Sequence, residues 1–234
     1  TPATAPAAEP IALSDSARTW CRDLLAGMLA YQKKYAEALK LTEAFLKDDP
    51  TNVDLLNLKS TCQQELGRMD QAVATLESAI KAARTAAERA TTANNLAYLY
   101  SVRGTHLTEA EQLVLQAIRV QETSAFVDTL GWVLYKKGEF GRAGMVFVQL
   151  LEQIEDTSES HPVMHDHAGD VLWRLGWQQR AIEAWKQAVR TAKDDEHPSS
   201  EVQSILGKTP KKIQAAEAGQ APALAPLGEG APLP

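Results

Sequence analysis

Histidine can act as a general acid, a general base or a metal ligand, and three of the five histidines in this chain lie in one short stretch. His161 and His165 are four residues apart, the spacing at which two imidazoles on one helical face can hold a metal ion. Pro162, however, fits best as the first residue of a helix, which leaves His161 outside it as a cap. His165 and His167 then point apart, so we interpret all three as packing or surface residues and expect neither a metal ion nor a cofactor.

Nucleophilic and phosphate-transfer chemistry also lack the residues that they need. The sequence contains no nucleophile elbow, no phosphate-binding loop and no Cys-x-x-Cys pair. Its two cysteines, Cys21 and Cys62, occupy positions that would not face each other in adjacent structural units, so we expect free thiols rather than a disulfide. We therefore predict that the protein is not an enzyme.

The charge and hydropathy of the chain argue against nucleic acid as a partner and against a membrane-spanning segment. The net charge of −6 and the pI near 5.4 argue against a nucleic-acid-binding protein, because binding phosphates requires a basic face. No apolar run approaches the roughly 18 residues that would cross a bilayer. The chain begins with Thr1 rather than Met, so we expect that processing or truncation removed a preceding segment.

The element that must position any functional side chain is a pair of helices, which is clearest at residues 125–151. Apolar residues follow helical spacing on both sides of Gly138, a residue that can adopt positive φ and so end the first helix. Small residues, among them Gly131 and Ala143, lie where two antiparallel helices would have to come close. One such pair cannot bury its apolar faces alone, so the sequence should contain further copies.

Five copies of this pair are visible in the sequence. The small residue that opens each second helix recurs at Ala38, Ala72, Ala110, Ala143 and Ala181. The intervals are 34, 38, 33 and 38 residues, which indicates a unit of about 34 residues with two insertions. This pattern resembles the tetratricopeptide repeat (TPR). The resemblance implies an all-α, right-handed α-solenoid of about five TPR helix pairs with a C-terminal capping helix.

The register of the repeats also predicts how the chain is divided. Residues 1–13 should form an Ala- and Pro-rich linker, and the TPR solenoid should occupy residues 14–218. Its repeats are expected at about 19–52, 53–86, 90–123, 124–157 and 162–193. Two capping helices are expected at about 199–218, separated at Gly207. The composition of residues 219–234, almost entirely Ala, Pro, Gly and Leu, predicts a tail that is disordered unless it docks against another surface.

Repeats four and five carry a more specific resemblance. The segments 128–135 (DTLGWVLY) and 167–176 (HAGDVLWRLG), followed by Trp185, are similar to the final repeats of bacterial TPR proteins of the cell envelope. Those proteins include outer-membrane lipoproteins that act as adaptors for carboxyl-terminal processing proteases. The resemblance implies a bacterial scaffold in the periplasm or cell envelope, tethered through the N-terminal linker. A cytoplasmic location is the alternative, because no lipid-acceptor cysteine is visible.

In this family the first helices of the repeats line a concave groove. The resemblance therefore implies twelve groove residues: Asn57, Thr61, Gln64, Asn94, Tyr98, Ser101, Asp128, Trp132, Tyr135, Asp166, Asp170 and Trp173. The amides can hydrogen-bond an extended peptide backbone, and the aromatic rings offer rigid apolar surface. Acidic side chains gather toward the C-terminal half, so we expect a partner segment that is extended, partly apolar, and neutral or basic there. For Trp132 and Trp173, packing between repeats is an equal alternative.

These residues favour a non-catalytic scaffold or adaptor that binds an extended peptide or loop of another protein in the concave groove. The alternative is a self-assembling structural protein, a homo-oligomer whose repeats stack or whose tail docks in a neighbour. The nearly uncharged tail supports this alternative, because it would lose little hydration free energy on docking against apolar groups. The two hypotheses differ in whether another protein or a second copy of the chain fills the groove.

Overall fold

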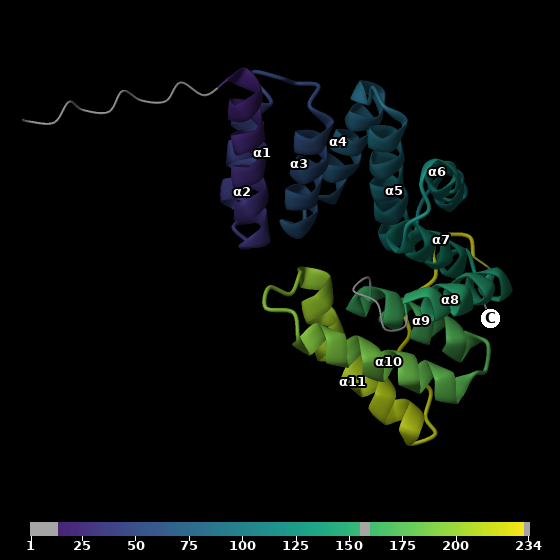
Figure 1. Cartoon of the computed structure of the whole chain (residues 1–234). Helices are drawn as coiled ribbons and strands as arrows, with labels where there is room; N and C mark the ends of the chain where they lie inside the picture. The colour runs from purple at the N-terminus through teal and green to yellow at the C-terminus, as the bar shows by residue number, and fades with distance from the viewer. Residues whose placement is uncertain (1–13, 155–159, 232–234) are drawn as a thin grey trace, which may run out of the picture.

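The computed structural model describes residues 14–154 and 160–231, and within them it contains eleven α-helices and no β-strand. In chain order the helices are α1 (Asp15–Tyr31), α2 (Tyr35–Phe45), α3 (Val53–Glu65), α4 (Met69–Ala82), α5 (Ala86–Arg103), α6 (Leu107–Val120), α7 (Ser124–Lys136), α8 (Phe140–Ile154), α9 (Pro162–Arg174), α10 (Gln178–Lys193) and α11 (Ser200–Glu217). Five helix pairs are followed by α11 (Figure 1), which confirms the predicted all-α repeat fold. None of these helices is long and apolar enough to cross a membrane. The predicted linker at 1–13 lies outside the described residues.

The first helices of several repeats begin at capping residues. Asn52 accepts a hydrogen bond from a backbone N–H at the start of α3, and Thr85 and Glu88 form a capping box at the start of α5. Pro162 is the first residue of α9 and His161 is its N-cap, as predicted. The turns inside pairs two to five each place one glycine at positive φ: Gly67, Gly104, Gly138 and Gly176. Local sequence therefore sets where these helices begin and end.

Within a pair, a glycine of the first helix receives an aromatic ring of the second. A Cβ added to Gly131 of α7 would lie 2.6 Å from Cε2 of Phe147 on α8. A Cβ added to Gly169 of α9 would lie 2.3 Å from Cδ1 of Trp185 on α10. Any larger residue would push the helices apart, so these small and bulky sites set the distance between paired helices.

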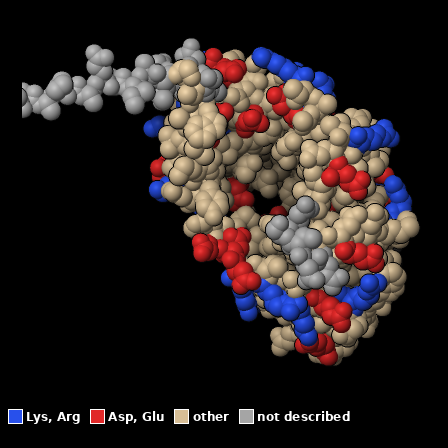
Figure 2. Space-filling model, viewed as in Figure 1, with Lys and Arg blue, Asp and Glu red and all other residues tan. Residues whose placement is uncertain are grey.

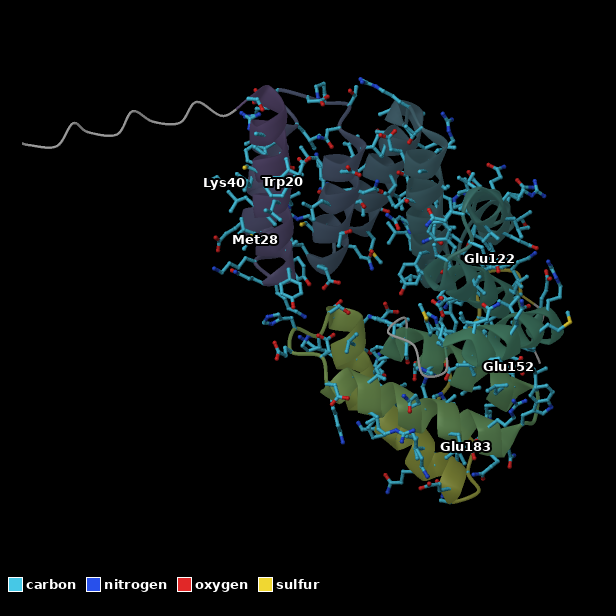
Figure 3. The ribbon with its side chains drawn as sticks, in the orientation of Figure 1. Trp20, Met28, Lys40, Glu122, Glu152 and Glu183 are labelled. Carbon is cyan, nitrogen blue, oxygen red and sulfur yellow. The ribbon has the colours of Figure 1, made fainter. Side chains whose placement is uncertain are left out.

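The two ends of the solenoid differ in how well they are packed. Trp20 and Met28 project from α1 with 65% and 51% of their surface exposed (Figure 3), and no described helix covers this face. The largest core cluster lies at the other end, where Phe147, Leu172 and Trp185 are almost completely buried. The C-terminal repeats are therefore the more compact half of the molecule.

The first helices form the inner wall of a closed curve. Helices α1, α3, α5, α7 and α9 each contact the next one along the wall. The ends approach each other, because the ring of Tyr31 lies edge-on to that of His197 with their centroids 4.8 Å apart. The backbone N–H of Ser200 also donates to Oε2 of Glu65 at 3.3 Å. Figure 2 shows the resulting ring with an opening at its centre.

The C-terminal cap differs from the prediction of two helices separated at Gly207. Instead, α11 runs without a break and contains Pro210 within it. Its buried residues are three or four positions apart and form one stripe: Val202, Ile205, Thr209 and Lys212. This stripe packs against α9 and α10, and its burial outweighs the helix-breaking tendency of the glycine and the proline.

Candidate functional site

The concave wall has two regions that differ in what lies on them. We define the covered region as the part of α7 and α9 beneath α11 and the tail, residues 219–231. It includes five predicted groove residues: Trp132, Tyr135, Asp166, Asp170 and Trp173. We define the open region as the adjoining wall on α3, α5 and the first half of α7, with the predicted residues Asn57, Thr61, Gln64, Asn94, Tyr98 and Asp128. Ser101 belongs to neither region, because it is fully buried with its hydroxyl bonded to the Tyr98 carbonyl.

The tail of the same chain fills the covered region. The backbone N–H of Ala225 donates to Oδ2 of Asp170 at 2.9 Å, and its carbonyl accepts from the Tyr135 hydroxyl at 2.7 Å. The carbonyl of Pro226 accepts from Nζ of Lys136 at 2.7 Å. The described part of the tail is therefore docked, which is the stated exception to the predicted disorder, because its backbone groups find partners on the wall.

The tail continues from α9 to the turn between α5 and α6. The N–H of Gly228 donates to the carbonyl of Lys136 at 2.8 Å, and the N–H of Glu229 donates to the carbonyl of Gly104 at 2.8 Å. The two backbones are so close that a Cβ on Gly104 would lie 2.9 Å from Cα of Gly228. Two tail leucines also pack against the core of repeats four and five: Leu224 and Leu227. The wall thus holds both the middle and the end of the tail.

Asp170 is at the centre of the covered region. Besides the Ala225 N–H, this fully buried carboxylate accepts hydrogen bonds from Nζ of Lys212 at 2.6 Å and from Nε1 of Trp185 at 3.1 Å. Burial raises the pKa of Asp170, and the charge of Lys212 opposes that rise. Burial lowers the pKa of Lys212, but Asp170 and Asp166 together outweigh it and leave that pKa raised. Lys212 therefore stays charged and ties α11 to α9.

The predicted aromatic residues pack within the protein. The ring of Trp132 stacks with those of Tyr135 and His167, with centroid distances of 4.8 and 3.7 Å. Trp173 stacks on Trp185 with the centroids 5.8 Å apart. Burial raises the pKa of Tyr135 to about 12, so its phenol keeps the proton that it donates to the tail. Trp132 is therefore a buried packing residue, whereas Trp173 packs on Trp185 and stays partly exposed.

The three clustered histidines lie in different environments. His161 caps α9 as predicted, whereas Nε2 of His165 lies 2.8 Å from Oγ of Ser160. Burial lowers the pKa of His165 to about 4, so this imidazole is neutral. Nδ1 of His167 lies 3.1 Å from Oδ1 of Asp128. Across residues 14–154 and 160–231, no group of three His, Cys, Asp or Glu side chains is arranged to hold a metal ion.

The open region carries polar side chains that link neighbouring helices. Nδ2 of Asn57 donates to Oγ1 of Thr92 at 3.0 Å, and Oδ1 of Asn57 accepts from Nδ2 of Asn95 at 3.0 Å. These amides connect α3 to α5. Thr61 is exposed and Gln64 is partly exposed, so solvent reaches this part of the wall.

A cavity of about 550 Å³ lies where the open region meets α9 and α11. Its walls include Asn94 and Tyr98 of α5, Asp128 of α7 and Glu201 of α11. The Tyr98 hydroxyl donates to Oε1 of Glu201, which connects the first helix of repeat three to the C-terminal cap. The cavity is large enough to accept a side chain of another molecule.

Several residues that shape the two regions were missed from the sequence. They are Asn95, Lys136, His167, Glu201 and Lys212. Asn95 could have been found, because it follows Asn57 by 38 residues, the same interval that separates Ala72 from Ala110. Glu201 and Lys212 lie beyond the repeats, so the repeat register carries no signal for them. The role of Lys136 depends on the tail, whose path the register does not describe.

Known proteins share this fold. The family model described as tetratricopeptide repeat matches residues 29–94, and that of anaphase-promoting complex subunit 5 matches residues 169–206. No curated protein sequence matches the chain. The thermophilic TPR protein TTC0263 of Thermus thermophilus is 20% identical with a TM-score of 0.63, over 80% of this chain and 98% of that one.

Two further structures are similar. PilW, described as a widely conserved type IV pilus biogenesis factor, is 18% identical with a TM-score of 0.64, over 88% of this chain and 93% of its own. MamA is 16% identical with a TM-score of 0.52, over 72% of this chain and 95% of its own. Proteins with this fold are generally non-catalytic scaffolds for protein–protein interaction. The repeat spacing, the family model matched over residues 29–94 and these neighbours agree on a tetratricopeptide repeat fold for this chain.

Proposed function

We propose that this protein is a non-catalytic adaptor that binds an extended peptide or loop of a partner protein in the open region of its concave groove. The supporting observation is the tail, which the covered region holds as an extended segment through side chains of first helices. The open region belongs to the same wall and is not covered by the described part of the tail. A partner segment would there meet the amides of α3 and α5.

This proposal changes which residues should contact the partner. Trp132 and Asp170 are buried under α11 and the tail, so replacing them would disturb the fold before it disturbed partner binding. Thr61 is exposed in the open region and its hydroxyl bonds to the backbone of its own helix. It is therefore a suitable position for a probe that leaves the fold unchanged.

A photo-crosslinking amino acid, p-benzoylphenylalanine, at Thr61 tests the proposal. The matched control places the same residue at Met145 of α8, a side chain that is 69% exposed outside the groove. After irradiation in a lysate of the native organism, we expect a discrete crosslinked protein from position 61 and none from position 145. Identical products from both positions, or none from position 61, would contradict binding in the groove.

Self-assembly is the second candidate function, and the tail favours it as well. Because the tail leaves α11 at Gly219, where φ is +70°, a change at this hinge would let it reach the covered region of another copy. Light scattering of the full chain and of a chain ending at residue 218 separates the two functions. Tail exchange predicts an oligomer that is lost on truncation, whereas a monomer in both samples excludes it.

A location in the bacterial cell envelope, implied by the resemblance of repeats four and five, stays a prediction. The similarity to a type IV pilus biogenesis factor is compatible with it, although at 18% identity this similarity concerns the fold. Fractionation of native cells with an antibody against the chain would test it.

A further inference from the structure

The cavity between the open region and the C-terminal cap has acidic side chains in its lining. Two of its lining side chains are carboxylates, Asp128 and Glu201, and its described lining contains neither Lys nor Arg. His161 also lines the cavity, and His167 lies against both carboxylates, with Nδ1 3.1 Å from Oδ1 of Asp128 and Nε2 3.9 Å from Oε1 of Glu201. Because Asp128 is buried against His167, Glu201 is the carboxylate that a ligand in the cavity would meet. The Glu201 side chain is 37% exposed, and a carboxylate that already accepts from Tyr98 can accept further hydrogen bonds.

Asn94 provides a second and independent observation at the same cavity. Only 7% of this residue is exposed, and its Oδ1 has no hydrogen-bond partner among residues 14–154 and 160–231. A buried acceptor without a donor destabilises the folded protein, so a site that lacks a donor is incomplete. A ligand that brings an N–H group into the cavity would remove this cost.

Part of the cavity wall is apolar. Val163 and Met164 of α9 line it, and both are more than nine-tenths buried. A long side chain with an aliphatic stem and a cationic end can place its stem against such a wall and its charge beside carboxylates. Lysine and arginine are the side chains with this composition.

We infer that this cavity receives a lysine or arginine side chain from the extended partner segment. Glu201 and the amide of Asn94 accept hydrogen bonds from its nitrogen atoms, Asp128 adds negative charge behind them, and Val163 and Met164 contact its methylene groups. This inference rests on the proposed function, because it assigns the chemistry of one side chain within the bound segment.

Four pools of fluorescent synthetic decapeptides test the inference with the full chain. Each pool is randomised at the flanking positions and carries Lys, Arg, norleucine or Glu at the centre. We expect the Lys and Arg pools to bind about five- to tenfold more tightly than the norleucine pool and the Glu pool to bind most weakly. Higher salt should reduce this preference.

The variant Glu201→Gln tests whether the preference for Lys and Arg peptides arises at this cavity. Gln keeps an acceptor for Tyr98 but removes the charge, so we expect the advantage of Lys over norleucine to fall at least about threefold, with norleucine binding unchanged. The matched control is Glu183→Gln, on the outer surface of α10 (Figure 3). It should change neither the advantage of Lys over norleucine nor the binding of the norleucine pool. Circular dichroism verifies that both variants are folded.

The outcomes separate the two proposals. If all four pools bind equally, or Glu201→Gln leaves the Lys preference intact, groove binding stands and the basic side-chain site is wrong. If the norleucine or Glu pool binds best, the cavity has a different preference and the inference is again overturned. If no pool binds, the inference fails together with the proposed function.

Discussion

The covered and open regions belong to the same concave wall, yet their polar side chains have different partners. In the covered region, Tyr135, Lys136 and Asp170 bond to the backbone of the tail. In the open region, Asn57 bonds to neighbouring side chains, and Oδ1 of Asn94 has no partner in the part of the chain that the structure describes. The repeat register therefore identifies positions that can contact a bound segment, and the rest of the chain decides which of them are free to do so.

The tail shows how the wall can hold a segment with few distinctive side chains. The wall bonds to tail N–H and carbonyl groups, which every peptide contains. If the open region binds a partner segment as proposed, specificity must come from side-chain sites such as the cavity beside Asn94. The comparison of the two regions predicts differences in stability and in binding that can be measured one variant at a time.

The largest difference in stability between variants of the two regions should appear when the central side chain of the covered region, that of Asp170, is removed. Asp170→Ala leaves Lys212 with Asp166 as its remaining carboxylate and leaves Nε1 of Trp185 without its acceptor, so we expect a loss of about 3–5 kcal/mol in the free energy of unfolding. Asn57→Ala, the matched change in the open region, should cost about 1 kcal/mol. Urea denaturation followed by circular dichroism measures both. Equal losses would show that the two regions do not differ in this way.

Removal of the tail should have a smaller effect. A chain ending at residue 218 loses the hydrogen bonds to Tyr135, Lys136 and Asp170 together with the packing of two leucines. Part of this loss is offset, because the truncated chain no longer pays the conformational entropy of ordering the tail. We expect about 1–3 kcal/mol lower stability with unchanged helicity. Hydrogen exchange should rise in the C-terminal half of α7 and not in α3. A chain of unaltered stability would mean that the tail is not held as described.

The tail can also be displaced by one substitution. Gly104→Ala would bring a Cβ within 2.9 Å of Gly228 and would strain a turn at φ +73°. Gly67→Ala is the matched control, because its φ is also +73° and its Cβ would meet no atom within 4 Å. Both variants should lose about 1 kcal/mol from backbone strain. Only Gly104→Ala should increase exchange of the Glu229 amide, and equal exchange in both variants would argue against this contact.

A smaller, pH-dependent effect is expected from His167. Burial lowers its pKa, but Asp128, Glu201 and Asp166 outweigh burial and leave the folded-state pKa raised. Because the folded protein binds this proton more tightly than the unfolded chain, the stabilisation is complete below about pH 6.5 and is lost as pH rises through the folded-state pKa. Denaturation at about pH 6 and about pH 9 should show a larger fall in the parent than in His167→Gln. The same fall in both would assign the pH dependence to another group.

The smallest effect on stability should come from the open region itself. Thr61→Ala removes an exposed hydroxyl, so the free energy of unfolding should change by less than about 0.5 kcal/mol. If the open region is the binding surface, the same variant should weaken capture of the partner identified by crosslinking. Unaltered capture by Thr61→Ala, and by a bulkier Thr61→Trp, would move the binding surface elsewhere.

The fold was predictable because its determinants are local and repeated. Gly138 ends α7, Pro162 begins α9, and Gly169 faces Trp185 within the span of one helix pair. The candidate site was predictable only in part. Spacing on a helix placed Asn57 and Asp170 on the wall, but it could not show that one of them remains accessible and the other is buried.

The sequence by itself determined the helix pairs, their number and the identity of the inner wall, because the repeat sets all three through contacts between residues close along the chain. Only the tertiary structure decided which half of that wall is free. Lys212 and Asp170 are 42 residues apart, and Ala225 and Tyr135 are 90 apart, so neither contact leaves a periodic signal. The tail adopts a defined path because the folded wall offers its backbone groups the partners that an isolated Ala- and Pro-rich segment lacks.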